Sequence, residues 1–400
     1  MSYEDSHPWI SFKLDLNSAN YLFWMQLGEA NSKCMHIFGT PLPSPISENL
    51  HKMYLAKGVL ATTAIEGNSL SQSQVLEHIE GKLKLPPSKE YLRQEVENIL
   101  NACNLIGQEL IDLKTYDVTF ELILCFNTLV LDKLPVDQEV RPGIIREYSV
   151  GVGNYLAAPA TDCKYLLEQL VDWLKNFDEV KLPGYSTTII KAVLVHLYIA
   201  WIHPFGDGNG RTARLLEFYI LCSAGIPSAA AHLLSNHYNE TRSQYYRKLD
   251  EARQNPMAFI DYAIEGFVDG LREQIKIIRD YQWDLTWQDY VNNLFKDKNR
   301  ISDKRRLHLL TDLAQNKDYV KLSDLTLISP RVAVDYAGKS QKTLTRDLEY
   351  LLDHKLIEIK ELTVRAKREI VLAFLPFLKT NDLLEKAELK PLIIDRLIVK

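Results

Sequence analysis

Residues 192–224 read AVLVHLYIAWIHPFGDGNGRTARLLEFYILCSA. A polar cluster, His203 to Arg214, separates an apolar run, Ala192 to Ile202, from an amphipathic run, Leu215 to Ala224. Such runs predict two buried helices, and the polar cluster between them predicts a tight loop. Because packed helices hold such a loop rigidly, its polar groups are candidates for a functional site.

The backbone of this cluster suits an anion. Gly206, Gly208 and Gly210 can take positive φ and turn their amide groups toward a ligand, because no Cβ stands in the way. Asn209 and Gly210 lie where the second helix is expected to begin, so free N–H groups and the positive end of the helix dipole converge there. The cluster therefore predicts a cradle for phosphate.

The side chains of the cluster add positive charge and a base. Arg211 and Arg214 lie three residues apart, so both guanidinium groups are expected on one side of the helix, where they can hold two phosphates. Phosphate would repel Asp207 unless a cation lay between them, which makes Asp207 the candidate Mg²⁺ ligand. His203 can accept a proton near neutral pH. The plainer interpretation is a surface turn with a structural histidine and an exposed basic helix face.

The same twelve residues match the H-x-F-x-D/E-G-N-G-R-x-x-R signature of the Fic family, so the chain resembles a Fic protein. The resemblance implies a protein adenylyltransferase, an enzyme that transfers AMP from ATP to a Ser, Thr or Tyr hydroxyl of a target protein, which is called AMPylation. It implies His203 as the base, Asp207 as the Mg²⁺ ligand and Phe205 as the apolar anchor of the loop. The implied ATP-binding residues are Gly208, Asn209, Gly210, Arg211, Thr212 and Arg214.

A second short motif lies upstream, in residues 62–68, TTAIEGN. From the residues alone this segment is a helix that ends at Gly67, with Glu66 in solvent. A glutamate in the last turn opposes the helix dipole, however, so another reason for its presence is needed. The stretch resembles the S/T-x-x-x-E-G/N inhibitory motif of Fic proteins. The resemblance implies that Thr62, Glu66 and Gly67 form a brake in which the Glu66 carboxylate pairs with Arg214.

Two further segments gain a role from the resemblance. Residues 141–154 alternate β-branched residues with turn formers and predict a short hairpin. It resembles the Fic flap, whose edge pairs with a target segment by strand addition, but an ordinary hairpin packed on helices fits equally well. Tyr245 and Tyr246 resemble a tyrosine pair beside the nucleotide base, although aromatic pairs in helices are more often core residues. The implied flap residues are Val150, Gly151, Val152 and Gly153.

The last hundred residues differ in charge and pattern. Residues 296–369 hold 17 Lys and Arg against 12 Asp and Glu, whereas the whole chain has a formal net charge of −5. Two helical patterns followed by two strands resemble a winged helix-turn-helix, whose second helix would present Lys342, Thr343 and Arg346 to DNA. A protein-interaction or dimerisation module is the alternative, because the positive charge is mild for a nucleic-acid binder. The expected elements are helices at 305–313 and 340–352 and strands at 356–359 and 370–374.

The composition fits a globular protein of two or three domains. The chain has 400 residues, 46% of them hydrophobic and 25% charged, which is ordinary. The N-terminus lacks a basic segment followed by an apolar stretch, and no run of about 18 apolar residues exists, so we expect a cytoplasmic protein without a membrane span. The five cysteines occur singly and are expected to be buried thiols. His232 and His237 lack a carboxylate partner at metal-site spacing.

Together these features predict a mainly α fold. It would consist of a Fic-type helical bundle with a short β-hairpin flap and a C-terminal winged helix-turn-helix domain. The expected domains are an N-terminal helical region with the inhibitory motif at 1–112, a Fic catalytic domain at 113–285 and a winged-helix-like domain at 286–400.

Three functions are open at this point. The first is an autoinhibited protein adenylyltransferase that uses ATP and Mg²⁺ to modify a target protein or itself. The second, from a different class, is a nucleotide-sensing regulator that binds DNA through its C-terminal domain. In the third, the same site removes AMP from a modified target, with Glu66 as a base that aligns water. The sequence does not specify the target, the transferred group or the oligomeric state, for which a homodimer is one candidate.

Overall fold

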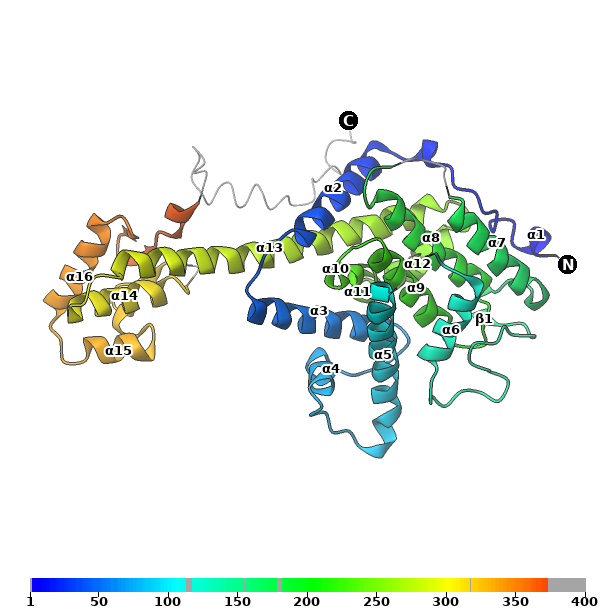
Figure 1. The fold of residues 1–400 in the computed structure, drawn as a ribbon, viewed down its shortest axis with the longest axis horizontal. Coiled ribbons are helices and arrows are strands. Elements are labelled where there is room, and N and C mark those ends of the chain that lie inside the picture. The colour runs from blue at the N-terminus through cyan, green and yellow to red at the C-terminus, as the bar shows by residue number, and fades with distance from the viewer. Residues whose placement is uncertain (1, 113–116, 154, 178–181, 317, 373–400) are drawn as a thin grey trace. The chain divides into compact units, whose positions relative to one another are not determined.

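The computed structural model of the chain divides into two compact units, Met1–Lys276 and Ile277–Lys400. Helices make up most of both units and the described sheets are small, as predicted for a mainly α chain (Figure 1). The described residues are 2–112, 117–153, 155–177, 182–316 and 318–372.

The first unit consists of helices and one small hairpin. Its helices are α1 (Tyr3–Ser6), α2 (Tyr21–Phe38), α3 (Ser44–Ala64), α4 (Gln72–Ile79), α5 (Glu90–Asp112), α6 (Phe120–Val130), α7 (Cys163–Lys175), α8 (Ser186–Ile202), α9 (Asn209–Ser223), α10 (Ser228–Ala231), α11 (Leu233–Glu240), α12 (Arg242–Glu251) and α13 (Met257–Phe295), which continues past Lys276. Its strands are β1 (Gly151–Val152) and β2 (Tyr155–Leu156), and short 3-10 turns lie at Leu16–Ser18, Pro87–Lys89 and Ala160–Asp162.

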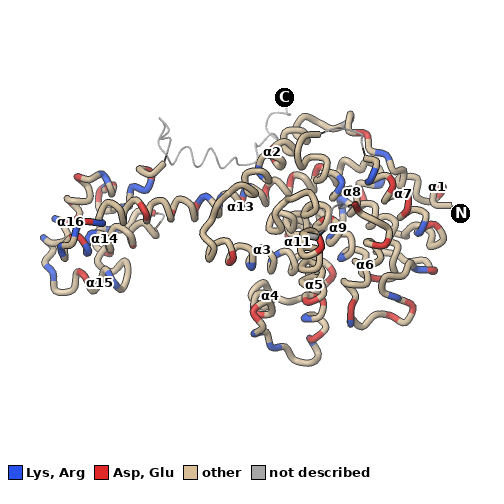
Figure 2. Tube along the Cα trace, viewed as in Figure 1, with Lys and Arg blue, Asp and Glu red and all other residues tan. Residues whose placement is uncertain are grey.

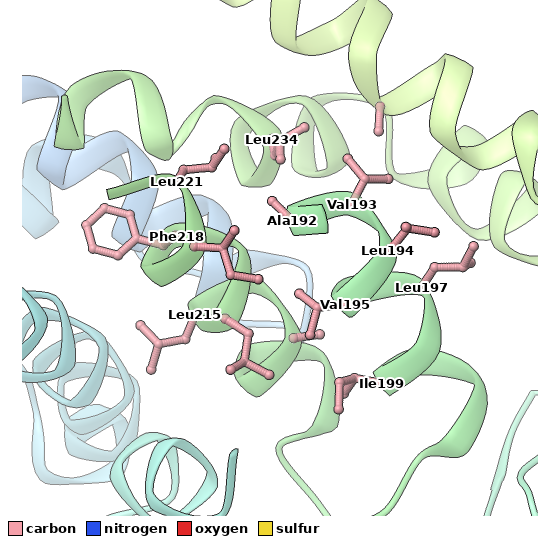
Figure 3. Packing of buried hydrophobic residues seen from close by; sticks show 14 of the residues in the cluster. Ala192, Val193, Leu194, Val195, Leu197, Ile199, Leu215, Phe218, Leu221 and Leu234 are labelled. Atoms are coloured by element: carbon pink, nitrogen blue, oxygen red, sulfur yellow. The ribbon is translucent and has the colours of Figure 1, made fainter. Parts of the chain in front are cut away.

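Helices α8 and α9 form the centre of the first unit. Nearly all of α8 is buried, and it carries apolar residues on every side, which is the pattern of a helix surrounded by protein. Figure 3 shows apolar side chains of the two helices in the core, among them Val195 and Ile199 from α8 and Leu215 and Phe218 from α9. Helices α3, α5, α6, α10 and α11 contact the other sides of α9. The loop between α8 and α9 is therefore held by two helices that cannot move independently of the core.

Helix α9 is buried over most of its length, as predicted for the second of two buried helices, although its run 215–224 has an amphipathic sequence pattern. Its one acidic residue, Glu217, is 1% exposed. Its Oε1 accepts a hydrogen bond from the Tyr238 hydroxyl at 2.8 Å, and its Oε2 lies 3.0 Å from His196 Nδ1. A polar residue with such partners can occupy the core, which a periodicity argument does not anticipate.

The hairpin of β1 and β2 lies later in the chain than predicted. Its antiparallel register pairs Gly151 with Leu156 and Val152 with Tyr155. Only β1 falls inside the predicted segment, residues 141–154, and β2 lies beyond it. The first part of that segment is irregular because its backbone groups bind elsewhere, as the Arg146 N–H does to Pro204 O at 3.0 Å.

The second unit combines three helices that follow α13 with a small sheet. Its elements are α14 (Ile301–Leu313), β3 (Val320–Lys321), α15 (Pro330–Tyr336), α16 (Gln341–Asp353), β4 (Ile357–Lys360) and β5 (Thr363–Ala366), with 3-10 turns at Leu325–Leu327 and Arg368–Val371. The strand order is β3-β5-β4, and both pairings are antiparallel. Leu309, Leu313, Leu351 and Val364 are among the residues of its own buried core.

The strand predicted at 370–374 was wrong. The chain reverses directly after β4, where Glu361 takes a φ of 51°, so that Lys360 pairs with Thr363 and β5 becomes the neighbouring strand. Ile370 and Val371 lie in a 3-10 turn and pack against the core of the second unit, and residues 373–374 lie outside the described part. An apolar β-branched run satisfied the strand pattern although its role is packing.

The cysteines and the helix lengths test two further expectations. All five cysteines are free thiols, and the expectation of burial was wrong for Cys125, which is exposed, while Cys222 is only partly buried. Cys125 lies on the outer side of α6, whose buried side holds Ile123, Phe126 and Val130. Across the described residues, no helix is both long enough and apolar enough to span a membrane.

Two helical glycines provide a matched test of the packing around α3. A Cβ at Gly58 would lie 2.1 Å from His232 Cγ, whereas a Cβ at Gly28 in α2 would meet no atom within 4 Å. We expect Gly58→Ala to lower the free energy of unfolding by about 1–3 kcal/mol through overpacking. Gly28→Ala should raise it by about 0.5–1 kcal/mol through helix propensity. Urea and thermal unfolding measure both, and a Gly58→Ala chain as stable as the Gly28→Ala chain would contradict this packing.

Candidate functional site

The loop between α8 and α9 is closed by one side chain. Asn209 Oδ1 accepts a hydrogen bond from the Phe205 N–H at 2.9 Å, and Asn209 Nδ2 donates to Phe205 O at 2.8 Å. The Phe205 ring is buried in the core. His203, directly after α8, adopts a left-handed conformation with a φ of 50°, which is uncommon for a residue with a side chain and turns the chain out of the helix. The two bonds to Phe205 and the turn at His203 fix the shape of the loop.

The three glycines of the loop have different structural reasons. Gly208, which precedes α9, has a φ of 76°. Gly206 and Gly210 do not have positive φ, so for them the expectation was wrong. At both positions space is limited instead, because a Cβ at Gly206 would lie 2.2 Å from the Tyr148 hydroxyl and one at Gly210 would lie 2.3 Å from Glu66 Oε1, so each would displace the end of that side chain. Glu66 thus lies against the first turn of α9, whose N–H groups have no partner within the helix.

Arg214 is a buried charge with an acidic partner. Its side chain has no exposed surface, and its Nη2 donates to Glu66 Oε1 at 2.5 Å and to Thr62 O at 2.9 Å. Burial alone would raise the pKa of Glu66, but the charge and hydrogen bond of Arg214, with Arg211 nearby, outweigh it and lower the pKa below its ordinary value. The Glu66 carboxylate is therefore ionised at neutral pH and forms an ion pair with Arg214.

The last turn of α3 and the turn that follows it supply the two partners of Arg214, Thr62 O and Glu66 Oε1. The Thr62 hydroxyl donates to Gly58 O within the helix, so Thr62 contacts Arg214 through its backbone carbonyl. Glu66 lies in the turn that follows α3, and Gly67, with a φ of 106°, leads the chain away from it. The carboxylate thus extends toward α9 from beyond the last helical turn of α3.

Arg211 has acidic partners on two elements. Its Nη1 lies 3.2 Å from Glu95 Oε1 on α5, and its Nη2 lies 3.2 Å from Asp207 Oδ1. Asn68 Nδ2 donates to the other oxygen of Glu95 at 2.8 Å. Burial raises the pKa of Glu95, and the negative charges of Glu66 and Asp207 add to this, while Asn68 and Arg211 oppose it. The sequence did not reveal Glu95, because it lies in an ordinary amphipathic helix and reaches Arg211 only in the folded chain.

Arg146 ties the hairpin to the loop, and the sequence did not reveal it either. Its guanidinium donates to four backbone carbonyls, His203 O at 2.8 Å, Tyr148 O at 2.6 Å, Ala158 O at 2.5 Å and Ile202 O at 3.4 Å. Tyr148 and Ala158 flank the hairpin, so one side chain holds both of its ends and the start of the loop. In the sequence nothing distinguishes Arg146 from Arg141, which is exposed.

His203 is uncharged at neutral pH. Burial lowers the pKa of His203 to about 4, and the positive charge of Arg146 acts in the same direction, whereas the Ala200 backbone, Glu66 and Asp207 oppose it. Because one ring N–H donates to the Ala200 carbonyl, the other nitrogen can accept a proton. The loop therefore presents a neutral base beside the N-terminus of α9.

Asp207 lies half-exposed in the turn before Gly208. Its Oδ1 accepts from the Gly208 N–H at 2.5 Å as well as from Arg211, and Asn127 Nδ2 donates to its carbonyl at 3.0 Å and to the Thr212 hydroxyl at 3.3 Å. The described hydrogen bonds of the carboxylate all use Oδ1, so Oδ2 is available to a cation. Among the described residues no cluster of three or more His, Cys, Asp or Glu could enclose a metal, so a cation here would need oxygens from a ligand as well.

The two tyrosines of α12 have different surroundings. Tyr245 is 3% exposed, its hydroxyl forms a 2.9 Å hydrogen bond with His196 Nε2, and burial raises its pKa. Tyr246 is 42% exposed. Tyr245 is therefore a core residue close enough to Arg214 to feel its charge, and Tyr246 is the tyrosine that can meet a ligand from solvent.

The remaining predicted residues lie on the hairpin and on α16. The exposed ones are Gly151, Val152, Gly153, Lys342 and Arg346, and Val150 and Thr343 are partly exposed. The structure thus brings the loop residues, both arginines and Glu66 into one site of the first unit. The residues of α16 belong to the second unit.

Comparisons with known proteins agree with this geometry. Residues 117–221 match the Fic/DOC family. The protein adenylyltransferase fic-1 of Caenorhabditis elegans is 32% identical over 197 residues, which cover 48% of this chain and 36% of that protein. The protein adenylyltransferase Fic of Nematostella vectensis is 28% identical over 227 residues, which cover 56% and 50%. The chain thus spans half or less of the length of these curated relatives.

Two solved structures share the fold. A Fic family protein from Desulfovibrio desulfuricans has a TM-score of 0.53 and 20% sequence identity, over 88% of this chain and 97% of that chain. Residues 134–508 of Fic-1 from C. elegans have a TM-score of 0.54 and 23% identity, over 65% and 73%. At these identities the likeness concerns the fold alone.

The depressed pKa of His203 can be tested by titration. We expect its imidazole carbon signals to change near pH 4, well below the ordinary histidine pKa of about 6.5, because burial lowers the pKa of His203 to about 4. Since the unfolded chain then binds more protons, this group makes folding more favourable as pH rises from about 4 to about 6.5. NMR of the ligand-free protein measures the midpoint, and a His203→Gln chain identifies the signal. A midpoint at or above 6.5 would contradict the burial argument.

Proposed function

Since residues 117–221 give this chain a Fic domain, we propose that it is a protein adenylyltransferase, which transfers AMP from ATP to a hydroxyl group of a target protein. The relatives from C. elegans and N. vectensis carry that name. The observation that carries the proposal is the placement of an uncharged His203 beside the N-terminus of α9, with Arg211 and Arg214 on the same helix.

In the proposed reaction a hydroxyl oxygen of the target attacks the α-phosphorus of ATP. A new P–O bond forms to that oxygen, the bond from the α-phosphorus to the oxygen that bridges to the β-phosphate breaks, and pyrophosphate leaves. His203 takes up the hydroxyl proton, which its neutral state permits and an imidazolium could not do. A positioned base of this kind contributes about 10²- to 10⁴-fold to the rate.

Unsatisfied donors support phosphate as the ligand of this helix terminus. Nε and Nη1 of Arg214 and Nε of Arg211 are buried and have no acceptor among the described residues. Buried donors without acceptors are rare in folded proteins because they cost free energy. Phosphate oxygens would supply the missing acceptors, and the N–H groups of the first turn of α9 would bind the same anion.

Asp207 would be the protein ligand of Mg²⁺. Its exposed carboxylate, with Oδ2 available, fits a cation that is held by one carboxylate and by substrate phosphates. When bound, Mg²⁺ would neutralise part of the phosphate charge. The Gly208 N–H and Arg211 hold Oδ1 and so fix the direction in which Oδ2 is offered.

Glu66 would act as a brake on this reaction. It takes up Nη2 of Arg214, and it lies against Gly210, where a phosphate would meet the helix N-terminus. An ionised carboxylate in that place competes for the guanidinium and repels the anion. The low pKa of Glu66 supports the proposal, because the brake requires the negative charge.

Glu95 would hold Arg211 as Glu66 holds Arg214. Its Oε1 lies 3.2 Å from the Arg211 guanidinium, and Asn68, two residues after Glu66, bonds its other oxygen. A movement of the turn after α3, which carries Glu66 and Asn68, would therefore change the acidic contacts of both Arg214 and Arg211. Burial raises the pKa of Glu95 whereas Arg214 lowers that of Glu66, which supports a weaker hold by Glu95.

Removal of the Glu66 carboxylate is the direct test of the brake. We expect Glu66→Gly to raise the transfer of label from ATP labelled at the α-phosphate by about ten- to a hundredfold, since the loss of a charged partner of Arg214 changes affinity by about 1.4–2.7 kcal/mol. Label incorporated into the chain itself and into lysate proteins is measured after electrophoresis in the presence of Mg²⁺.

Two variants serve as controls for this experiment. His203→Ala in the Glu66→Gly chain should abolish incorporation. Glu95→Gln, which removes one of the two acidic partners of Arg211 but leaves Arg214 paired, should raise it by less than Glu66→Gly. Equal incorporation of label in wild type and in Glu66→Gly would contradict the proposed inhibitory role of Glu66. Lower incorporation together with faster loss of AMP from a labelled target in wild type would favour the alternative in which Glu66 serves as a base.

For the second unit we propose a winged-helix domain that contacts DNA through α16. The order α14-β3-α15-α16-β4-β5 and the sheet order β3-β5-β4 support this assignment. Lys342 and Arg346 are exposed near the start of α16, and no described ion pair involves them, whereas Asp347 on the same helix is buried against Arg305 and Arg306. Figure 2 shows both signs of charge interspersed over α14 and α16, so any such surface is confined to the start of α16.

Salt-dependent binding tests the DNA proposal. We expect the full chain to bind a fluorescent 20-base-pair duplex, and the double change Lys342→Ala, Arg346→Ala to lower the slope of log K against log salt by about two, one for each lost phosphate contact. Anisotropy between 50 and 200 mM NaCl measures the slope. The matched control removes two exposed lysines elsewhere in the unit, Lys296 and Lys304, and should leave the slope unchanged. An equal change in both double variants would rule out α16 as the contact surface.

A further inference from the structure

The first residues of the chain run beside the hairpin of β1 and β2, which we call the flap. We call residues 3–12 the N-terminal strap. The Tyr3 N–H donates to Asp162 Oδ2 at 2.9 Å, and the Phe12 N–H donates to the Tyr198 hydroxyl at 3.0 Å. The two ends of the strap are thereby fixed to the 3-10 turn that follows the flap and to α8.

His7, in the middle of the strap, bonds the backbone of the flap. Its ring is 4% exposed, its Nε2 lies 2.9 Å from Leu156 O in β2, and its Nδ1 lies 2.8 Å from Ser6 Oγ. A carbonyl only accepts, so His7 Nε2 carries a hydrogen and donates it to Leu156 O.

An aromatic group joins this contact to the catalytic loop. The Tyr155 ring in β2 lies 6.0 Å from the His7 ring, and the Arg253 guanidinium lies over both Tyr155 and Trp9. The Tyr155 hydroxyl donates to Trp201 O at 2.6 Å, two residues before His203. His7 therefore holds β2 through Leu156 O, and the Tyr155 hydroxyl holds it to the backbone near His203.

The register of the flap determines which backbone groups point outward. The Ala157 N–H donates to Val150 O at 3.1 Å, so this pair is a hydrogen-bonded pair. In an antiparallel ladder such pairs alternate with pairs whose N–H and C=O groups point away from the partner strand, and the next pair is Gly151 and Leu156. His7 occupies the outward carbonyl on the β2 edge.

The β1 edge presents the matching outward groups at Gly151. Gly151 and Val152 are exposed, and no described hydrogen bond outside the flap uses the N–H or C=O of Gly151. A glycine inside a strand often marks a place where another backbone approaches closely. The two edges thus differ, because one is covered by a buried side chain and the other is open and lacks a side chain at its outward position.

We propose that His7 is a positioning residue for protein targets. By closing the β2 edge it directs an extended segment of the target to the β1 edge, where the segment pairs with the N–H and C=O of Gly151 and presents its Ser, Thr or Tyr hydroxyl to His203. This inference rests on the proposed adenylyltransferase function and on strand addition as the mode of docking. The contacts of His7 and Tyr155 then hold the flap at a constant distance from the base.

The test uses the full chain with Glu66→Gly as background and α-labelled ATP with Mg²⁺. The acceptor is a pool of ten-residue peptides, each with one central Ser, Thr or Tyr, because backbone pairing accepts any extended segment. We expect His7→Ala to raise the KM for the pool by about fivefold, as for one lost hydrogen bond, while nucleotide binding is unchanged. His7→Gln, whose amide nitrogen can replace Nε2, should restore the KM.

Substitutions at Gly151 test whether the target segment pairs with the β1 edge of the flap. Gly151→Pro removes the outward N–H without touching the ladder, and Gly151→Ala keeps that N–H while its Cβ would lie 3.2 Å from Tyr155 O. We expect the proline chain to lose peptide labelling at least tenfold more than the alanine chain, with equal nucleotide binding in both. Hydrogen exchange of the Ala157 amide should accelerate in His7→Ala and not in His7→Gln.

Each outcome has a distinct meaning. If Glu66→Gly incorporates no label into anything, the proposed function fails rather than the role of His7. If the chain labels itself but no peptide, or if Gly151→Pro labels peptides as well as Gly151→Ala does, target pairing with the β1 edge is overturned. An unchanged KM in His7→Ala, with unchanged Ala157 exchange, would overturn the positioning role.

Discussion

The burial of Arg214 is the constraint on which the rest of the site depends. A guanidinium without access to water needs an anionic partner, because an unpaired buried charge destabilises a fold severely. In the ligand-free chain that partner is Glu66, brought by the turn after α3. The position of α3 against α9 is therefore linked to the charge state of the site, and a competing anion would act on both.

The acidic and basic groups around α9 form one network. Arg214 pairs with Glu66, Arg211 pairs with Glu95 and Asp207, and Asn68 connects Glu95 to the turn that holds Glu66. Groups that share partners do not contribute independently, so changes at two of these positions should combine non-additively. Glu66 and Asp207 of this network raise the pKa of His203, but burial and the positive charge of Arg146 act against protonation, and burial has the largest effect.

The sequence predicted what is local and missed what is distant. The helix starting at Asn209 and the left-handed Gly208 follow from residue types in one stretch. Glu95, Arg146 and His7 carry no such signal, because each acts on residues that lie far away along the chain. Gly206 and Gly210 were predicted for the wrong reason, since the atoms that exclude a Cβ come from the flap region and from the turn after α3.

The contact between Glu66 and the first turn of α9 has a consequence for small anions. A carboxylate tethered beside the amides it faces competes at an effective local concentration that is typically millimolar or higher. A small anion such as chloride makes few simultaneous contacts, whereas a polyanion can engage several donors together. A carboxylate in this place would therefore disfavour small anions more than multivalent ones.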